Sequence, residues 1–124
     1  MKPIRRISPP GTYFITSTTW QRRSLFVAEP MVRLLLQTLY SYRRQGKSQL
    51  HEFVIMPEHF HLLLTPSGIT LERAVQFIKG GYSYAVKDQL EKTIEIWQRG
   101  FTDHRIRNAA DFAHHRLYIH RNPA

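Results

Sequence analysis

The pattern of apolar and polar positions predicts three strands in the first half of the chain. Residues 12–20 (TYFITSTTW) alternate in polarity and are rich in β-branched and aromatic side chains, which is typical of a strand. Residues 48–56 (SQLHEFVIM) and 59–66 (HFHLLLTP) have the same character, and only Pro57 and Glu58 lie between them. Two strands joined by so short a connection predict a β-hairpin.

Two segments with helical spacing of apolar residues are present, one after the first predicted strand and one after the predicted hairpin. After Pro30, apolar residues recur three and four positions apart up to Gly46, which predicts a helix that begins with a proline and ends at a glycine cap. A second helix begins at Thr70, whose side chain suits the N-cap position. The pair Gly80 and Gly81 interrupts its pattern and indicates a kink or a close approach of another backbone.

The remaining elements complete a recognisable order. Residues 94–107 have the character of irregular structure leading into a strand, and Asn108 is placed to cap a last helix that ends at Pro123. The order β-α-β-β-α-β is that of the split βαβ, ferredoxin-like or RRM-like fold. The sequence therefore predicts one α+β domain, residues 1–124, with a four-stranded antiparallel sheet, helices on one face and an extra C-terminal helix.

The charge and composition of the chain limit the classes of partner and site that it can have. Eighteen Lys and Arg against nine Asp and Glu give a net charge of +9, and the pI is about 10.4. On so small a domain this favours a polyanionic partner such as nucleic acid. The absence of cysteine excludes disulfides and thiolate metal sites. Without a secretory signal or an apolar run of about 20 residues, we expect a soluble cytoplasmic protein with no membrane partner.

Two histidines in the third predicted strand are the first candidates for chemistry. Side chains two apart on a strand share a face, and the Cα atoms of His59 and His61 should lie roughly 6.6 to 7 Å apart, so both rings can reach one ion. A pair of surface histidines on an open sheet face explains so short a motif equally well. A metal centre that accepts substrate needs about three protein ligands, so this pair is incomplete by itself.

The last predicted helix offers the missing groups. Tyr118 and Asn122 are four residues apart and so share a helix face. If that helix packs across the open face of the sheet, it brings a nucleophile and a metal ligand to the histidines together.

Five segments of the chain together resemble those of a known family. The segments TSTTWQRRSLF, FVIMPEHFHLLLTP, IKGGYSYAVK, IWQRGFTDHRIRN and HHRLYIHRNP are similar, in the same order, to those of the single-tyrosine HUH transposases, in the branch of the REP-associated tyrosine transposases. The resemblance implies that Tyr118 is the catalytic nucleophile and that His59, His61 and Asn122 bind the metal, Mg²⁺ or Mn²⁺. The C-terminal tail is short relative to this family.

The resemblance also implies an activity and partners. We expect cleavage and rejoining of single-stranded DNA at hairpins of the REP type, through a 5′-phosphotyrosine, in a bacterial cytoplasm, by a monomer or a homodimer. His114 and His115, one turn before Tyr118, are possible proton acceptors. The possible DNA contacts are Arg22, Arg23, Lys79, Tyr82, Tyr84, Arg99, Arg105 and Arg107.

Three alternatives remain open from the sequence. A non-catalytic module that binds single-stranded nucleic acid, or an inactive transposase remnant, would also explain the charge and the fold. A small metal-dependent nuclease would use water in place of Tyr118 and would leave no protein–DNA adduct.

Overall fold

The structure of the protein is a computed structural model that describes residues 7–121. The strands are β1 (Tyr13–Thr18), β2 (Ser48–Met56), β3 (His59–Pro66) and β4 (Thr102–Arg105). The helices are α1 (Glu29–Gln45), α2 (Leu71–Leu90) and α3 (Ala109–Arg121), with short 3-10 turns η1 (Trp20–Arg22) and η2 (Leu25–Val27).

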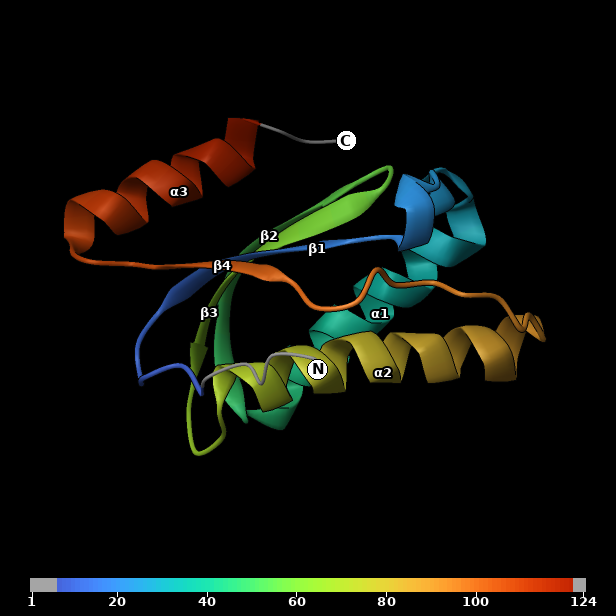
Figure 1. Cartoon of the computed structure of the whole chain (residues 1–124), viewed down its shortest axis with the longest axis horizontal. Helices are drawn as coiled ribbons and strands as arrows, with labels where there is room; N and C mark the ends of the chain where they lie inside the picture. The colour runs from blue at the N-terminus through green and yellow to red at the C-terminus, as the bar shows by residue number, and fades with distance from the viewer. Residues whose placement is uncertain (1–6, 122–124) are drawn as a thin grey trace, which may run out of the picture.

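The strands form one antiparallel sheet in the order β2-β3-β1-β4. Helices α1 and α2 lie on one face of this sheet, and α3 crosses the other face as a separate layer (Figure 1). The predicted α+β fold with an additional C-terminal helix is confirmed. Among the described helices, none has both the length and the apolar character that a bilayer crossing requires.

The helix ends predicted at Gly46, Thr70 and Asn108 are observed, whereas the one predicted at Pro123 lies outside the described residues. Gly46 caps α1 with a φ of 73°, a left-handed conformation that glycine adopts without strain. The Thr70 hydroxyl accepts a hydrogen bond from the backbone N–H of Arg73 at 3.1 Å, and the Asn108 side chain accepts one from Asp111 at 2.8 Å. These bonds satisfy amides that the first turn of each helix leaves without partners.

Two local expectations differ from the structure. Of the two alternatives predicted for Gly80 and Gly81, the kink is absent, since α2 runs without a break through both glycines. A Cβ on Gly81 would lie 3.7 Å from the Thr38 side chain of α1, which is an ordinary van der Waals distance, and a Cβ on Gly80 would meet no atom within 4 Å, so the backbone approach at these glycines is not unusually close. Strand β1 also ends before residue 20, because the Thr19 amide turns to the Glu58 carbonyl (2.8 Å) and Gln21 then takes a φ of 57°.

The main core lies between the sheet and helices α1 and α2. Alternate residues of β1 and β3 point into it, as the period of a strand requires. Its largest buried side chains include Tyr13, Ile15, Leu35, Leu39, Phe60, Leu62, Leu64, Leu71, Ile78 and Tyr82. The intervening residues of the same strands face α3, so the sequence alternation decides which side chains are available to the other layer.

A β-bulge interrupts this alternation in β2. Leu50 pairs with Leu64 and Glu52 pairs with Leu63, which leaves His51 as the extra residue. A bulge re-aims neighbouring side chains. Here the His51 ring contacts Phe112 of α3, and Glu52 also reaches α3.

Candidate active site

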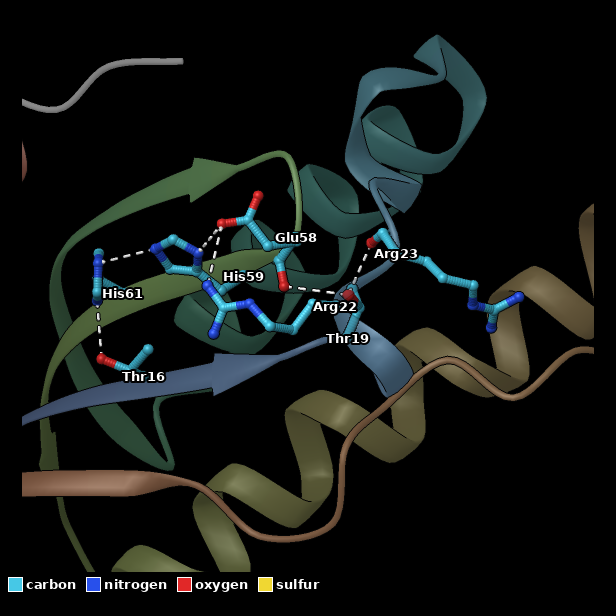
Figure 2. A network of polar contacts seen from close by, with 7 residues as sticks. All are labelled: Thr16, Thr19, Arg22, Arg23, Glu58, His59 and His61. Carbon is cyan, nitrogen blue, oxygen red and sulfur yellow. Dashed lines mark hydrogen bonds and ion pairs between the residues drawn. The ribbon is translucent and has the colours of Figure 1, made fainter.

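Two imidazoles of β3 face each other beneath α3. Their Nε2 atoms lie 3.1 Å apart, and the ring centroids of His59 and His61 are separated by 4.7 Å at an interplanar angle of 73°. Phe60, between them in sequence, is buried in the main core. The structure therefore brings both histidines together on one face, with their Nε2 atoms facing each other (Figure 2).

Each ring is held through its other nitrogen. His59 Nδ1 lies 2.8 Å from Glu58 Oε1, and His61 Nδ1 lies 2.8 Å from Thr16 Oγ1 (Figure 2). An ionised carboxylate only accepts hydrogen bonds, so the His59 Nδ1–H donates to Glu58. The Thr16 hydroxyl can donate or accept and therefore suits either tautomer of His61. Thr16 and His61 are direct cross-strand partners, so the register of β1 against β3 makes this contact.

Backbone hydrogen bonds fix the turn that carries Glu58. The Thr19 amide donates to the Glu58 carbonyl at 2.8 Å, and the Phe26 amide donates to the Pro57 carbonyl at 3.0 Å. The Thr19 hydroxyl lies between two carbonyl acceptors, 2.7 Å from that of Arg23 and 3.1 Å from that of Glu58. The Arg22 guanidinium lies 3.9 Å from Glu58 Oε1 at the outer edge of this network (Figure 2). The segment that follows β1 therefore holds the carboxylate which orients His59.

The environment of the pair suits metal ligation. His61 is 7% exposed, and burial, followed by the neighbouring His59, lowers its pKa from 6.5 to about 4. The ring is therefore neutral at pH 7, with a nitrogen lone pair available. Histidines that bind metals hold their second nitrogen against a carboxylate, carbonyl or similar partner, as both rings do here. The donor set thus fits a divalent cation that takes its remaining ligands from elsewhere.

Helix α3 places Tyr118 beside this pair. The ring centroid of Tyr118 lies 5.5 Å from that of His61 and 6.0 Å from that of Phe14. Phe14 in turn stacks on His61 at 5.0 Å, so it forms an apolar floor under both side chains. Tyr118 is 46% exposed. A phenol is therefore accessible to solvent next to the two converging imidazole nitrogens.

A small apolar cluster fixes α3 over the sheet. Ile119 is buried against Val54 and Leu63, side chains that the alternation of β2 and β3 directs away from the main core. Tyr118, the preceding residue, lies on the flank of the helix that faces His61. Asn122, the expected third metal ligand, lies outside the described residues.

A second group of polar side chains lies at the N-terminal half of α3. The Asp111 carboxylate contacts His104 Nε2 of β4 at 2.9 Å and His115 Nδ1 at 3.1 Å. The potential ligand atoms of these three residues lie within 4.8 Å of one another, a spacing that a metal ion could bridge. His115 also contacts Phe14, at 4.8 Å between centroids, whereas His114 is exposed.

Three of the predicted DNA contacts lie on α2, across the sheet from the histidines. Tyr82 is 0% exposed, and its hydroxyl donates to the Met31 carbonyl at 2.9 Å, so the prediction that it stacks on bases is wrong. Burial lowers the pKa of Lys79, whose Nζ donates to the carbonyls of Gln98 and Gly100. Lys79 therefore holds the chain before β4, and its contact with DNA stays a prediction. Tyr84 is exposed.

The predicted arginine contacts are mostly at the surface. The Arg23 guanidinium makes intramolecular hydrogen bonds, which it donates to the carbonyls of Glu95 and Trp20. Arg105 donates to the Pro10 carbonyl at 2.7 Å, and Arg107 Nε lies 3.6 Å from Asp111. The exposed arginines among those predicted are Arg22, Arg99, Arg105 and Arg107, and their contacts with DNA stay predictions.

Comparison with known proteins assigns the chain to a family. A family model described as "Transposase IS200 like" matches residues 11–122, which include every described strand and helix. The chain belongs to the IS200-like transposase family. The match covers both histidines of β3 and Tyr118 of α3.

Individual relatives agree with this assignment. The REP-associated tyrosine transposase of Escherichia coli (strain K12) is 30% identical over 115 residues, which are 91% of this chain and 66% of that protein. A structure of the REP-associated tyrosine transposase bound to a REP hairpin has a TM-score of 0.75 at 30% identity, over 96% of this chain and 70% of the other. The resemblance to this branch is confirmed. The chain spans about two thirds of the length of the curated relative.

A more distant structure shares the fold. The crystal structure of a Deinococcus radiodurans protein, assigned as a transposase, has a TM-score of 0.66 at 21% identity and covers 100% of this chain and 99% of its own. At this identity the likeness concerns the arrangement of strands and helices alone.

Proposed function

We propose that this transposase domain cleaves and rejoins single-stranded DNA, with Tyr118 as the nucleophile. One observation carries the proposal: the phenol of α3 lies against His61, and His61 Nε2 and His59 Nε2 converge 3.1 Å apart on the same face. A nucleophile beside a preformed pair of imidazole metal ligands is the constellation that phosphodiester cleavage needs.

The reaction can be written from the side chains. The Tyr118 oxygen attacks the phosphorus of a phosphodiester while the bond from phosphorus to the 3′ oxygen breaks. The departing oxygen takes a proton and becomes a free 3′-hydroxyl, and the 5′-phosphate stays on Tyr118. The phosphotyrosyl link is still a diester, so a 3′-hydroxyl can attack it and reverse the step. Strand joining therefore needs no further energy source.

The two histidines would hold a divalent cation, Mg²⁺ or Mn²⁺, and Asn122 is the third ligand that we expect from the sequence. When bound, such an ion supplies Lewis acidity toward a phosphate oxygen. The chain itself orients the ligands: Glu58 holds the tautomer of His59, and Thr16 holds the ring of His61. Mixed nitrogen and oxygen ligation suits manganese at least as well as magnesium, which favours oxygen ligands.

A proton must leave the Tyr118 hydroxyl during attack. His114 and His115 stay the proposed acceptors, and they differ in environment. His115 Nδ1 already faces the Asp111 carboxylate at 3.1 Å, whereas the His114 ring is exposed. His114 is therefore the side chain of the two that is readier to pass a proton to water.

The proposed substrate is single-stranded DNA that carries a hairpin. The relative of known structure is bound to a REP hairpin, and this chain shares 30% of its sequence with that protein. The net charge of +9 favours contact with the phosphate backbone. Arg22 lies beside Glu58 and His59, so it is the proposed backbone contact nearest to the site.

A denaturing-gel assay tests this function. The protein is mixed with Mn²⁺ and end-labelled single-stranded REP hairpin DNA, and a slowly migrating protein–DNA adduct is scored. We expect the adduct with wild type and its absence with Tyr118→Phe. Tyr40→Phe is the matched control, because Tyr40 is a helical tyrosine with the same 46% exposure.

The alternatives give different results. Strand cleavage without an adduct would indicate a nuclease that uses water. DNA binding with neither cleavage nor adduct would indicate the binding module or the inactive remnant.

A further inference from the structure

Few apolar contacts hold α3 on the sheet. Ile119 is its single buried residue among those described, and it packs with Val54 and Leu63. Partly buried Phe14 and Phe112 add to this cluster. The opposite layer is far more deeply anchored, because α1 and α2 contribute many buried side chains to the main core. Polar contacts must therefore contribute much of what fixes the orientation of α3.

Glu52 makes such contacts on one flank of the helix. Its Oε1 lies 2.5 Å from His120 Nε2, and its Oε2 lies 3.8 Å from Arg116 Nε. The bulge at His51 directs Glu52 toward α3. Arg116 and His120 are four residues apart and so lie on one side of the helix. They also bracket Tyr118, two positions before it and two after it.

Asp111 makes the matching contacts on the other flank. Its Oδ2 accepts hydrogen bonds from His104 Nε2 of β4 and from the Arg107 amide, both at 2.9 Å, and its Oδ1 faces His115 Nδ1. Asp111 and Tyr118 are seven residues apart and lie on nearly the same side of the helix, given 3.6 residues per turn. Asp111 thus connects β4 to the side of α3 that carries Tyr118.

We propose that Glu52 and Asp111 are positioning residues that fix the rotation of α3 about its axis and so hold the Tyr118 ring against His61. Glu52 fastens the flank toward β2, and Asp111 fastens the flank toward β4. Without the contacts of either carboxylate, α3 can rotate about its axis, because the small apolar cluster around Ile119 alone does not fix its orientation. A shift of about 1 Å between nucleophile and reaction partner is enough to slow a reaction 100-fold. This inference rests on the proposed role of Tyr118.

The surroundings of Asp111 favour this role over metal binding by the same group. Oδ2 already accepts hydrogen bonds from the Arg107 amide and the His104 Nε2–H. Oδ1 lies 3.1 Å from His115 Nδ1, which also lies 2.9 Å from the Asp111 backbone carbonyl. The Arg107 guanidinium lies 3.6 Å from Oδ2 and adds a positive charge beside the place that a cation would take. The carboxylate therefore serves as a hydrogen-bond acceptor that joins β4 to α3.

The test compares Glu52→Gln and Asp111→Asn with wild type. These substitutions keep the side-chain shape and remove the charge. Glu29→Gln is the matched control, because it removes a carboxylate that pairs with Arg33 on α1, away from α3. Three quantities are measured: the rate of adduct formation with REP hairpin DNA, the dissociation constant for that DNA at fixed salt, and the melting temperature.

For both variants we expect adduct formation to slow about 10- to 100-fold, while the dissociation constant changes less than about twofold. The control should match wild type in all three measurements. Unchanged rates would overturn the proposal. A rate that falls only in step with DNA affinity and melting temperature would also overturn it, because that result indicates general loss of fold.

Two further measurements do not depend on activity. Proton NMR should show a nuclear Overhauser contact between the rings of Tyr118 and His61 in wild type, which weakens in each variant. If wild type forms no adduct, the proposed function fails, and this contact still tests the positioning role. Zinc titration is the other measurement: an ion bound by wild type and lost in Asp111→Asn would show a metal centre and overturn the assignment of Asp111.

Discussion

Replacing Thr16 by valine is the sharpest test of how the histidine pair is prepared for a metal. The substitution keeps the shape of the side chain and removes the hydroxyl that lies 2.8 Å from His61 Nδ1. In a complex in which His61 Nε2 binds a cation, Nδ1 carries the proton and needs an acceptor. Without Thr16 that N–H stays unsatisfied in a ring that is 7% exposed. The metal-free ring can still turn toward another partner, so the penalty falls mainly on the metal-bound form.

The size of the effect follows from this difference. A buried donor without a partner costs about 1–3 kcal/mol. At 1.4 kcal/mol for each factor of ten, this corresponds to roughly 5- to 150-fold weaker binding. Loss of an outer-shell partner typically lowers metal affinity about 10- to 100-fold, which lies inside that range. We therefore expect the dissociation constant for Mn²⁺ to rise at least about fivefold.

Isothermal titration with Mn²⁺, supported by the electron paramagnetic resonance signal of the free ion, measures this constant. Thr38→Val is the control, because it also deletes a hydroxyl with a 2.8 Å hydrogen bond, to the Leu34 carbonyl within α1. It should lower stability slightly and leave Mn²⁺ binding unchanged. Equal affinity of Thr16→Val and wild type would refute the idea that Thr16 prepares His61 for a cation.

Three further predictions concern single side chains. His61→Ala should abolish adduct formation while DNA affinity in a filter-binding assay stays within about twofold, because the basic surface dominates binding; equal losses of both would contradict the metal-ligand role. Tyr82→Phe should lower the free energy of unfolding in urea by about 0.5–1.5 kcal/mol, since it removes the hydrogen bond from the buried hydroxyl to the Met31 carbonyl, and should not change DNA affinity. Ser17→Ala should leave that free energy unchanged or raise it, because the Ser17 hydroxyl is buried without a hydrogen-bond partner among the described residues; clear destabilisation would show a partner for that hydroxyl.

Local signals in the sequence were sufficient for the element order. Alternation identified β2 and β3, and residue types at Gly46, Thr70 and Asn108 identified helix ends, because caps depend on neighbouring residues alone. The bulge at His51 was not predictable, since SQLHEF continues an ordinary strand pattern and only the pairing with β3 reveals the extra residue. The glycine pair in α2 does not kink the helix, because a glycine lowers the helix propensity of a segment without by itself ending a helix that packs along its length.

In the candidate active site, too, the features that depend on neighbouring residues were predictable, and those that depend on strand pairing or helix packing were not. That His59 and His61 share a face follows from strand geometry, so the sequence predicted it. The role of Thr16 as a partner of His61 could not be predicted from the sequence, because this contact depends on the register between β1 and β3. Glu58 offered a weak signal, as a carboxylate next to His59 in the chain. Tyr82 was misassigned because the buried side of α2 becomes visible only with α1 in place.

The shallow attachment of α3 has a consequence for motion. Segments with few buried contacts open at lower free energy than the rest of a domain, and they show it in amide hydrogen exchange. The amides of α3 should therefore exchange well before those of α1 and α2, in a local opening that leaves the sheet intact. In the proposed strand transfer such an opening would have a use, because the DNA end attached to Tyr118 would have to meet a new 3′-hydroxyl after the first one leaves. Local opening of α3 would let Tyr118 carry that end to another 3′-hydroxyl while the sheet stays folded.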